Sequence, residues 1–383
     1  MHNMKHIKDF TIHRFRGLRD LKIENLGQIN LFVGNNNSGK TSALEAFSVF
    51  CDPLSLRKWY EIAWQREAAG ASPSVIDRLM WVFPWGTNDT HELSSERTEI
   101  LLSALGSFPV KRISASYEKF AEMPNIQRPP SLWLEEDIEK RETEIERLKI
   151  HVSISARQVQ PTLIDENADI LFQQILTFSD NGPISSSNNN RKQGVFKFPN
   201  QIVTPLSHRT GGLTSQLWSE AVEANLKAET IKLLRFFDPA IQDVDLISPK
   251  VSRQFISIKH ERLGRAPLYT FGDGLRRVFM LATTIPRVKG GLLLIDELET
   301  AIHTKALEKT FDWLVNACID NDIQLLATTH SLEALDAILE ASREHADLVV
   351  YRLQQDKEQT TATRFDKEMT LRLREELGME LRY

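Results

Sequence analysis

The chain has 383 residues, 41% of them hydrophobic, and a net charge of −5, so it can form one large α/β domain or two smaller ones. Acidic and basic residues are numerous but balanced, which excludes a global basic field and leaves any DNA contact to a local patch. The longest apolar runs, such as residues 290–295, are too short to span a bilayer, and no apolar secretion signal opens the chain. We therefore expect a soluble cytoplasmic protein with no membrane partner, in which Cys51 and Cys318 are buried thiols.

The first part of the chain has the hydrophobic pattern of strands followed by helical segments. Residues 7–33 predict paired strands, the last of them a short buried run at 29–33. A helix is expected over residues 43–50, and helical segments broken by glycine and proline from residue 52 to about 105. The next predicted strands lie at 110–120 and 149–154.

The middle of the chain is read as a set of inserted segments. Residues 132–148 are dense in Glu, Lys and Arg with apolar residues at helical intervals, which favours a short charged surface helix over the stub of a coiled coil. Residues 179–194 are rich in Ser, Asn and Gly and predict a mobile loop. We expect residues 51–199 to be inserted into a nucleotide-binding core formed by residues 1–50 and 200–383.

The last part of the chain alternates strands with helices. This pattern indicates a mostly parallel sheet covered by helices, and therefore an α/β fold. The predicted elements are a helical stretch at 217–237, strands at 255–259, 291–296, 323–328 and 347–353, helices that begin near 274, 304 and 332, and a last helix at 368–377.

A phosphate-binding loop follows the buried run at residues 29–33. The segment matches G-x-x-x-x-G-K-[ST] at each fixed position and opens a helix. Glycines let the backbone N–H groups turn toward a phosphate, the lysine reaches the β- and γ-phosphates, and the threonine hydroxyl is placed to ligate Mg²⁺. The expected nucleotide-binding residues are Gly34, Asn35, Asn36, Asn37, Ser38, Gly39, Lys40 and Thr41, with the adjoining Ser42.

Two carboxylates end the apolar run at residues 291–295. We expect Asp296 to hold Mg²⁺ through its water shell and Glu297 to polarise the attacking water, since neighbouring strand residues point to opposite faces. Glu299 and His303 follow at i and i+4. A helical metal pair is conceivable, but we favour a carboxylate at a helix start and a residue at an interface between protomers.

Two further turns are expected at the same edge of the sheet. His330 ends the strand at 323–328, where it could bind the γ-phosphate or orient the water, and it is assigned a catalytic role. Gly272, Asp273 and Gly274 start a helix ahead of the acidic strand. They form either a helix N-terminus capped by Asp273 or a turn that faces the nucleotide of a neighbouring molecule.

In their order and approximate spacing, these four elements resemble the ABC-class ATPase heads. The most similar branch is the SMC-like one, which includes OLD-family ATPases and the ATPases of phage-defence systems such as Gabija, Septu and PARIS. Residues 12–18, I-H-R-F-R-G-L, look like the N-terminal strand of that branch, and residues 296–303 look like its D-E-x-E-x-x-x-H extension of Walker B. The resemblance covers residues 5–50 and 200–355, and implies an ABC-type head with an N-terminal antiparallel lobe, helical insertions, and ATP and Mg²⁺ as cofactors.

The resemblance also implies a partner. In this family the phosphate loop of one protomer faces the signature turn of another, so that ATP joins two heads in a head-to-tail sandwich dimer. Phe271–Gly274 would be the signature, and it departs from the L-S-G-G-Q of transporters, which argues against a transporter subunit. The Q-loop glutamine has no clear position, and Gln158 and Gln160 are its candidates.

Two functions remain open at this point. The first is an ATPase switch of prokaryotic anti-phage defence that controls a separately encoded effector, a nuclease or a toxin, since no OLD-type nuclease domain fits in the residues after His330. The second is a DNA-binding SMC-like clamp or repair ATPase. Without an N-K-x-D guanine motif, ATP is favoured over GTP. The candidate DNA-binding clusters are Arg14 with Arg16 and Arg19, Lys111 with Arg112, and Arg191 with Lys192.

Overall fold

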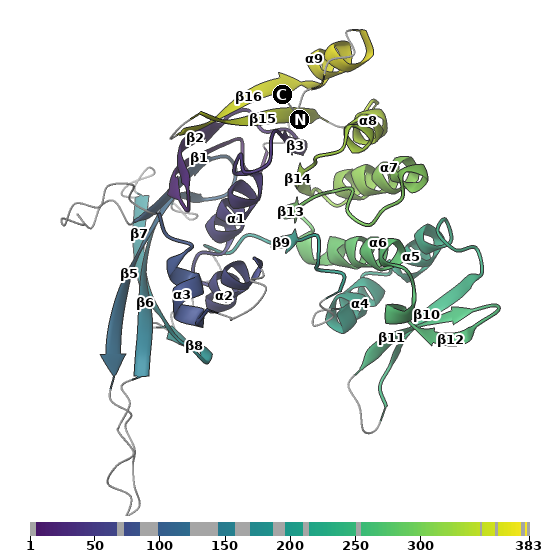
Figure 1. The fold of residues 1–383 in the computed structure, drawn as a ribbon, viewed down its shortest axis with the longest axis horizontal. Helices are drawn as coiled ribbons and strands as arrows, with labels where there is room; N and C mark the ends of the chain where they lie inside the picture. Colours follow the sequence, from purple (N-terminus) through teal and green to yellow (C-terminus); the bar gives the residue numbers. More distant parts are fainter. Residues whose placement is uncertain are drawn as a thin grey trace, which may run out of the picture.

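A six-stranded sheet forms the centre of the molecule (Figure 1). The computed structural model describes residues 5–66, 73–84, 99–122, 145–157, 169–186, 196–209, 214–249, 254–344, 347–356, 359–376 and 380. The sheet has the order β16-β15-β3-β14-β13-β9, and all neighbours pair in parallel except the terminal β15–β16 hairpin. Its strands are β3 (Ile29–Val33), β9 (Asn200–Val203), β13 (Leu292–Ile295), β14 (Gln324–Thr328), β15 (Leu348–Asp356) and β16 (Gln359–Asp366).

A second large sheet is antiparallel throughout. It has seven strands in the order β2-β1-β4-β5-β6-β7-β8, so strands from the middle of the chain extend the N-terminal hairpin. Its strands are β1 (Asp9–Phe15), β2 (Leu18–Ile23), β4 (Ile100–Leu105), β5 (Val110–Glu122), β6 (Ile145–Arg157), β7 (Asp169–Ser179) and β8 (Gly182–Ser186). A small antiparallel sheet contains β10 (Ile241–Ile247), β11 (Phe255–His260) and β12 (Gly264–Pro267).

Helices cover both faces of the central sheet. Figure 1 shows α1 between the two large sheets, and α6, α7 and α8 on the opposite face of the central one. The helices are α1 (Lys40–Cys51), α2 (Leu56–Trp64), α3 (Val75–Met80), α4 (Thr214–Glu223), α5 (Lys227–Leu234), α6 (Asp273–Thr284), α7 (Thr304–Asp320), α8 (Leu332–Ala341) and α9 (Lys367–Leu371). Short 3₁₀ turns lie at Leu268–Thr270 and Ile285–Val288, and a π-helical turn lies at Arg372–Glu376.

The inner strands β3, β13 and β14 are buried on both sides, which is why they read as mostly continuous hydrophobic runs. In β3 all five residues are buried: Phe32 belongs to the cluster around α1, whereas Leu31 and Val33 belong to the cluster under α6–α8. Complete burial of one such side chain contributes about 1.5–3 kcal/mol to the free energy of folding. The central sheet is therefore packed between α1 with the antiparallel sheet on one face and α6–α8 on the other.

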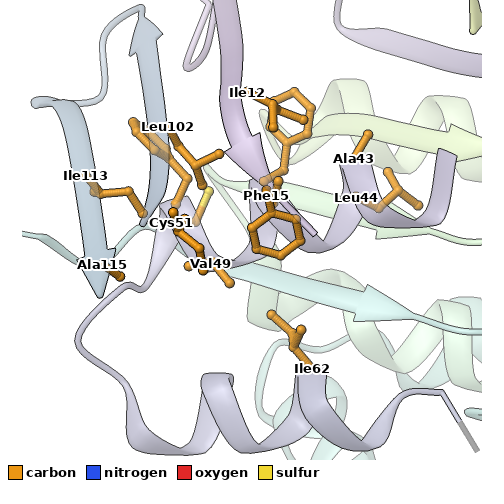
Figure 2. Packing of buried hydrophobic residues seen from close by; sticks show 14 of the residues in the cluster. Ile12, Phe15, Ala43, Leu44, Val49, Cys51, Ile62, Leu102, Ile113 and Ala115 are labelled. Atoms are coloured by element: carbon orange, nitrogen blue, oxygen red, sulfur yellow. The ribbon is translucent and has the colours of Figure 1, made fainter. Parts of the chain in front are cut away.

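The cluster around α1 joins the phosphate-loop helix to the antiparallel sheet. Figure 2 shows Ile12 and Phe15 of β1 beside Ala43 and Leu44 of α1, with Leu102 of β4 in the same cluster. The rings of Phe10 and Phe47 stack with their centroids 3.9 Å apart. This packing fixes the helix that begins directly at the phosphate loop.

The predicted α/β class and the main alternation of strands and helices are confirmed. Four predictions of local structure are wrong. Residues 100–105 form β4 and not part of a helical segment, residues 182–186 form β8 within the predicted loop, residues 145–148 begin β6 where a charged helix was predicted, and two helices separated at Asn225 replace the single stretch at 217–237. Residues 132–144 and 187–194 lie outside the described residues.

The two cysteines lie in the two different core clusters, as expected. Cys51 and Cys318 are both buried and unpaired with each other. Burial raises the pKa of the Cys318 thiol to about 12 and raises that of Cys51 further, so both stay protonated. In the described part of the chain, no helix is both long and apolar enough to cross a bilayer.

Candidate functional site

The phosphate loop turns sharply at its glycines. Gly34 and Gly39 have φ of 135° and 90°, values that side chains with a Cβ rarely adopt. A Cβ at Gly34 would lie 2.2 Å from the carbonyl oxygen of Leu353, and one at Gly39 would lie 2.5 Å from Cδ2 of Leu18. The loop is therefore pressed against β15 and the β1–β2 hairpin, and its two glycines are needed for both backbone shape and space.

Lys40 lies inside this loop. Its Nζ donates to the carbonyl oxygens of Gly34 and Asn35, both at 2.8 Å, and lies 3.4 Å from Oγ of Ser38. Burial lowers the pKa of Lys40, while Asp296, Glu297 and Glu299 counteract that shift. The side chains of residues 35–37 are exposed, whereas that of Lys40 is buried within the loop.

Asp296 lies directly beside the loop. Its Oδ1 and Oδ2 accept hydrogen bonds from the Thr41 hydroxyl at 3.1 and 2.9 Å, and Oδ1 also accepts from the Thr328 hydroxyl at 2.7 Å. Asp296 is 7% exposed. A threonine hydroxyl beside a carboxylate is the hard oxygen donor set that Mg²⁺ takes, so these residues fit the implied ion. No cluster of three or more His, Cys, Asp or Glu side chains suited to a metal is found in the described ranges.

Glu297 occupies an unusual backbone conformation. Its φ is 49°, in the left-handed region, which costs a non-glycine residue about 1–3 kcal/mol. Its N–H donates to the Thr328 hydroxyl at 2.8 Å, and its Oε2 accepts from the Thr300 hydroxyl at 2.8 Å. Because β13 ends at Ile295, Asp296 and Glu297 lie in the turn that follows the strand. Their carboxylates have different partners because of this turn, and not because neighbouring strand residues point to opposite faces.

Glu299 holds the turn that carries His330. Its Oε2 accepts from the Thr329 hydroxyl at 2.8 Å and its Oε1 from the His330 N–H at 2.9 Å. The expectation of a carboxylate at a helix start is wrong, since His303 is the N-cap of α7 and accepts from the Lys305 N–H at 3.2 Å. Burial and the charge of Lys40 lower the pKa of His330, so its imidazole is neutral at pH 7.

The glycine turn before the acidic strand is built differently from the predicted cap. Gly272 is the N-cap of α6 and makes no side-chain bond, and Asp273 is the first helical residue. Its carboxylate pairs with Arg209 and, at 3.0 Å, with Arg276. A Cβ at Gly274 would lie 2.7 Å from the Ala301 carbonyl oxygen, whereas nothing lies within 4 Å of one at Gly272. Gly274 thus serves packing in its own chain, and the space beside Gly272 is open.

Three positions that the sequence analysis did not assign contact the predicted site. Arg277 donates to the carbonyl oxygens of Asp296 and Glu297, and Thr328 bonds both residues. Arg66 donates to the Ser42 hydroxyl at 2.8 Å, which places it next to the phosphate loop. An arginine among apolar residues of the helix was the signal in the sequence that could have pointed to Arg277, whose burial is seen in the folded chain.

The candidate Q-loop residues Gln158 and Gln160 lie outside the described residues, as do Arg191 and Lys192. The first basic cluster is largely engaged within the chain. The Arg16 Nε lies 2.6 Å from the buried carboxylate of Glu45, Arg14 pairs with Glu99 at 3.4 Å, and the Arg19 guanidinium donates to the carbonyl oxygens of Arg16 and Leu18. Lys111 pairs with Asp169 at 2.5 Å.

Replacing Thr328 with valine tests how the turn at Asp296 and Glu297 is held. Thr328→Val keeps the side-chain shape but removes the acceptor of the Glu297 N–H and the shorter of the two hydrogen bonds to Asp296 Oδ1, which then keeps only its bond from the Thr41 hydroxyl. We expect a loss of about 1–3 kcal/mol in the free energy of unfolding, measured by urea denaturation. Thr310→Val is the matched control, because among the described residues that buried hydroxyl bonds the Ala306 carbonyl of its own helix, away from the acidic turn. An equal loss in both variants would contradict a special role for Thr328.

Two family models match the chain. The model described as "AAA domain, putative AbiEii toxin, Type IV TA system" matches residues 135–336, more than half of the 383 residues. The model described as "AAA ATPase domain" matches residues 4–78, which contain the phosphate loop. These matches confirm the prediction of an ABC-class P-loop ATPase.

Relatives and solved structures extend over different shares of the chain. "Uncharacterized protein MJECL11" of Methanocaldococcus jannaschii is 34% identical over 112 residues, 29% of this chain and 98% of its own length. An "ATP/GTP phosphatase" of Helicobacter pylori is 22% identical over 348 residues, 88% of this chain and 89% of its own length. An Smc head bound to the "C-winged helix domain of ScpA" aligns with a TM-score of 0.47 and 12% identity, over 95% of this chain and 99% of that one. The SMC head domain from Thermotoga maritima aligns with a TM-score of 0.41 and 13% identity, over 94% and 99%.

Proposed function

We propose a function for this chain, which belongs to the family described as "AAA domain, putative AbiEii toxin, Type IV TA system". It is an ATP-hydrolysing switch of a prokaryotic anti-phage defence system. It controls a separately encoded effector, which is a nuclease or a toxin. The convergence of Lys40, Thr41 and Asp296 at one edge of the central sheet is the observation that carries the proposal. The wording of the family description, which names a toxin of a toxin–antitoxin system, supports the proposed setting.

The chemistry follows from the charges and donors at this edge. Lys40 and the loop N–H groups bind the β- and γ-phosphates, while Thr41 and Asp296 are the residues that would hold Mg²⁺. When bound there, the ion would supply charge neutralisation at the phosphate oxygens. Glu297 orients the attacking water and accepts its proton as a general base. The neutral His330 imidazole hydrogen-bonds the γ-phosphate. The products are ADP and phosphate.

We also propose that the site is completed by a second copy of the chain. The N-terminus of α6 presents Gly272 with open space beside it, so a phosphate of a partner-bound nucleotide can approach the backbone there. Arg209 and Arg276 pair with the carboxylate of Asp273. The negative charge of Asp273 is therefore balanced and does not repel an approaching phosphate. Nucleotide binding would then report assembly of the head-to-tail dimer.

The activity is tested by phosphate release from purified protein with ATP and Mg²⁺, repeated with EDTA and with GTP. We expect release with ATP that stops on chelation. The setting is tested in the native host by deleting the gene and plating phage, with the wild-type gene and the Lys40→Ala variant reintroduced. Recovery of an effector with the tagged chain and restored resistance only with the wild-type gene are expected. Unchanged phage sensitivity and no recovered effector would refute the switch, even if ATP is hydrolysed.

A further inference from the structure

Arg277 is an arginine whose side chain is completely enclosed. It lies on α6, one turn after Asp273, and is 0% exposed. Its guanidinium donates to the Asp296 carbonyl oxygen at 3.1 Å, to the Glu297 carbonyl oxygen at 3.3 Å, and to the carbonyl oxygen of Thr204 after β9. The side chain thus joins three elements at the carboxyl edge of the central sheet: α6, the turn after β9 and the turn after β13.

Enclosing a guanidinium is costly, so its surroundings indicate what keeps it charged. Burial lowers the pKa of Arg277 to about 10, and the negative charges of Asp296, Glu297 and Glu299 work against this shift. At neutral pH the side chain is therefore a fixed cation behind the acidic turn. An apolar residue at this core position would serve packing alone, without the three directed hydrogen bonds.

The turn that Arg277 holds is the one whose geometry the proposed hydrolysis needs. Glu297 has a left-handed φ of 49°, so its conformation depends on contacts that oppose relaxation. Thr328 bonds the backbone N–H of Glu297 from the β14 side, and Arg277 bonds its backbone carbonyl from the α6 side. Together the two contacts fix the backbone from which the Glu297 carboxylate extends.

We propose that Arg277 is a positioning residue for ATP hydrolysis, which fixes the backbone of Asp296 and Glu297 so that the Glu297 carboxylate faces the attacking water. The inference rests on the proposed ATPase function. Arg277 is fully buried and its guanidinium bonds the backbone of the acidic turn, so it acts through Glu297 and not by contact with the nucleotide. Its loss should therefore lower the rate of hydrolysis much more than the affinity for ATP.

The first test compares Arg277→Met and Arg277→Lys with Arg235→Met. Arg235 also holds two backbone carbonyls, those of Ile241 and Gln242, but in the small sheet that contains β10. We expect Arg277→Met to lower kcat by about 100-fold, as for a displaced catalytic group, with ATP affinity changed by less than about threefold. Arg277→Lys keeps the charge but not the fork of donors, and should retain part of the rate. Arg235→Met should hydrolyse ATP at the wild-type rate.

The second test is a double-mutant cycle with Glu297→Gln. If Arg277 acts through Glu297, adding Arg277→Met to Glu297→Gln should lower kcat by less than about twofold further. Three results would overturn the inference. The first is a double variant whose loss of kcat is the product of the two single losses, and the second is a wild-type kcat in folded Arg277→Met. The third is a loss of kcat in both Arg277 variants that equals their loss of folded protein, measured by circular dichroism. A wild-type chain that hydrolyses no ATP would instead refute the proposed function.

Discussion

Lys40→Met is expected to abolish ATP binding and hydrolysis while leaving the fold intact. In the structure the Lys40 ammonium lies within the loop, 2.8 Å from the Gly34 and Asn35 carbonyl oxygens, where phosphate oxygens would also be within its reach. Methionine fills a similar volume but provides no charge to oppose the β- and γ-phosphates. We expect kcat/KM to fall by at least about 100-fold, which corresponds to roughly 2.7 kcal/mol. Phosphate release and the binding of a fluorescent ATP analogue measure the two effects.

The matched control for Lys40 is a second buried lysine, whose charged neighbours lie near the other end of α1. Lys58 on α2 is 6% exposed, and burial lowers its pKa as it does for Lys40, but its Nζ lies 4.0 Å from a carboxylate oxygen of Glu61 and it is not in the loop. Lys58→Met should change thermal stability without changing ATP turnover. Retained turnover in Lys40→Met would show that the segment Gly34–Thr41 is not the nucleotide site.

The parts of the fold that the sequence predicted are those in which one local signal dominates. The central strands β3, β13 and β14 are continuous apolar runs, and α1 follows a complete phosphate-loop pattern. By contrast, residues 100–105, I-L-L-S-A-L, contain good helix formers, yet they form β4 because β1 and β5 pair with them on both sides. Here tertiary pairing overrides intrinsic propensity.

Cross-strand pairing explains the other large error. The charged residues near 145–148 were read as the exposed side of a helix, since Ile145 and Leu148 are three residues apart. In β6 the same charges form ion pairs with β5, such as Lys119 with Glu146 at 2.9 Å, while Leu148 is buried against the antiparallel sheet. A single sequence does not reveal a partner strand more than twenty residues away.

The site shows the same division between local and distant signals. Gly34–Thr41 and Asp296–Glu297 could be predicted as site residues because each is a compact motif with a chemical requirement. The roles of Thr328 and Arg277 depend on contacts across 32 and 20 residues of sequence, and these become visible only in the folded chain. The motifs predict the reacting groups. The residues that orient those groups belong to no recognisable sequence motif.

Glu297→Gln is expected to stop hydrolysis while ATP stays bound. Glutamine keeps the length of the side chain and an oxygen that can accept from the Thr300 hydroxyl, now 2.8 Å from Oε2, so the turn should be preserved. Glutamine has no negative charge, so it cannot accept a proton from the attacking water. We expect kcat to fall by about 10²–10⁴-fold, the usual contribution of a general base. Because the substrate is then consumed slowly, the proposed head-to-tail dimer should persist with ATP and Mg²⁺, and light scattering should report twice the monomer mass.

Glu299→Gln separates this role from the general effect of removing an acid from the site. Both oxygens of Glu299 are engaged by the turn of Thr329 and His330, so this variant should weaken that turn and His330 with it, without trapping the ATP dimer. If Glu299→Gln traps ATP and Glu297→Gln turns over normally, the catalytic role belongs to Glu299. If neither variant dimerises with ATP but Glu297→Gln still loses kcat, the acidic turn hydrolyses ATP within one chain, and the open space beside Gly272 is not a nucleotide contact.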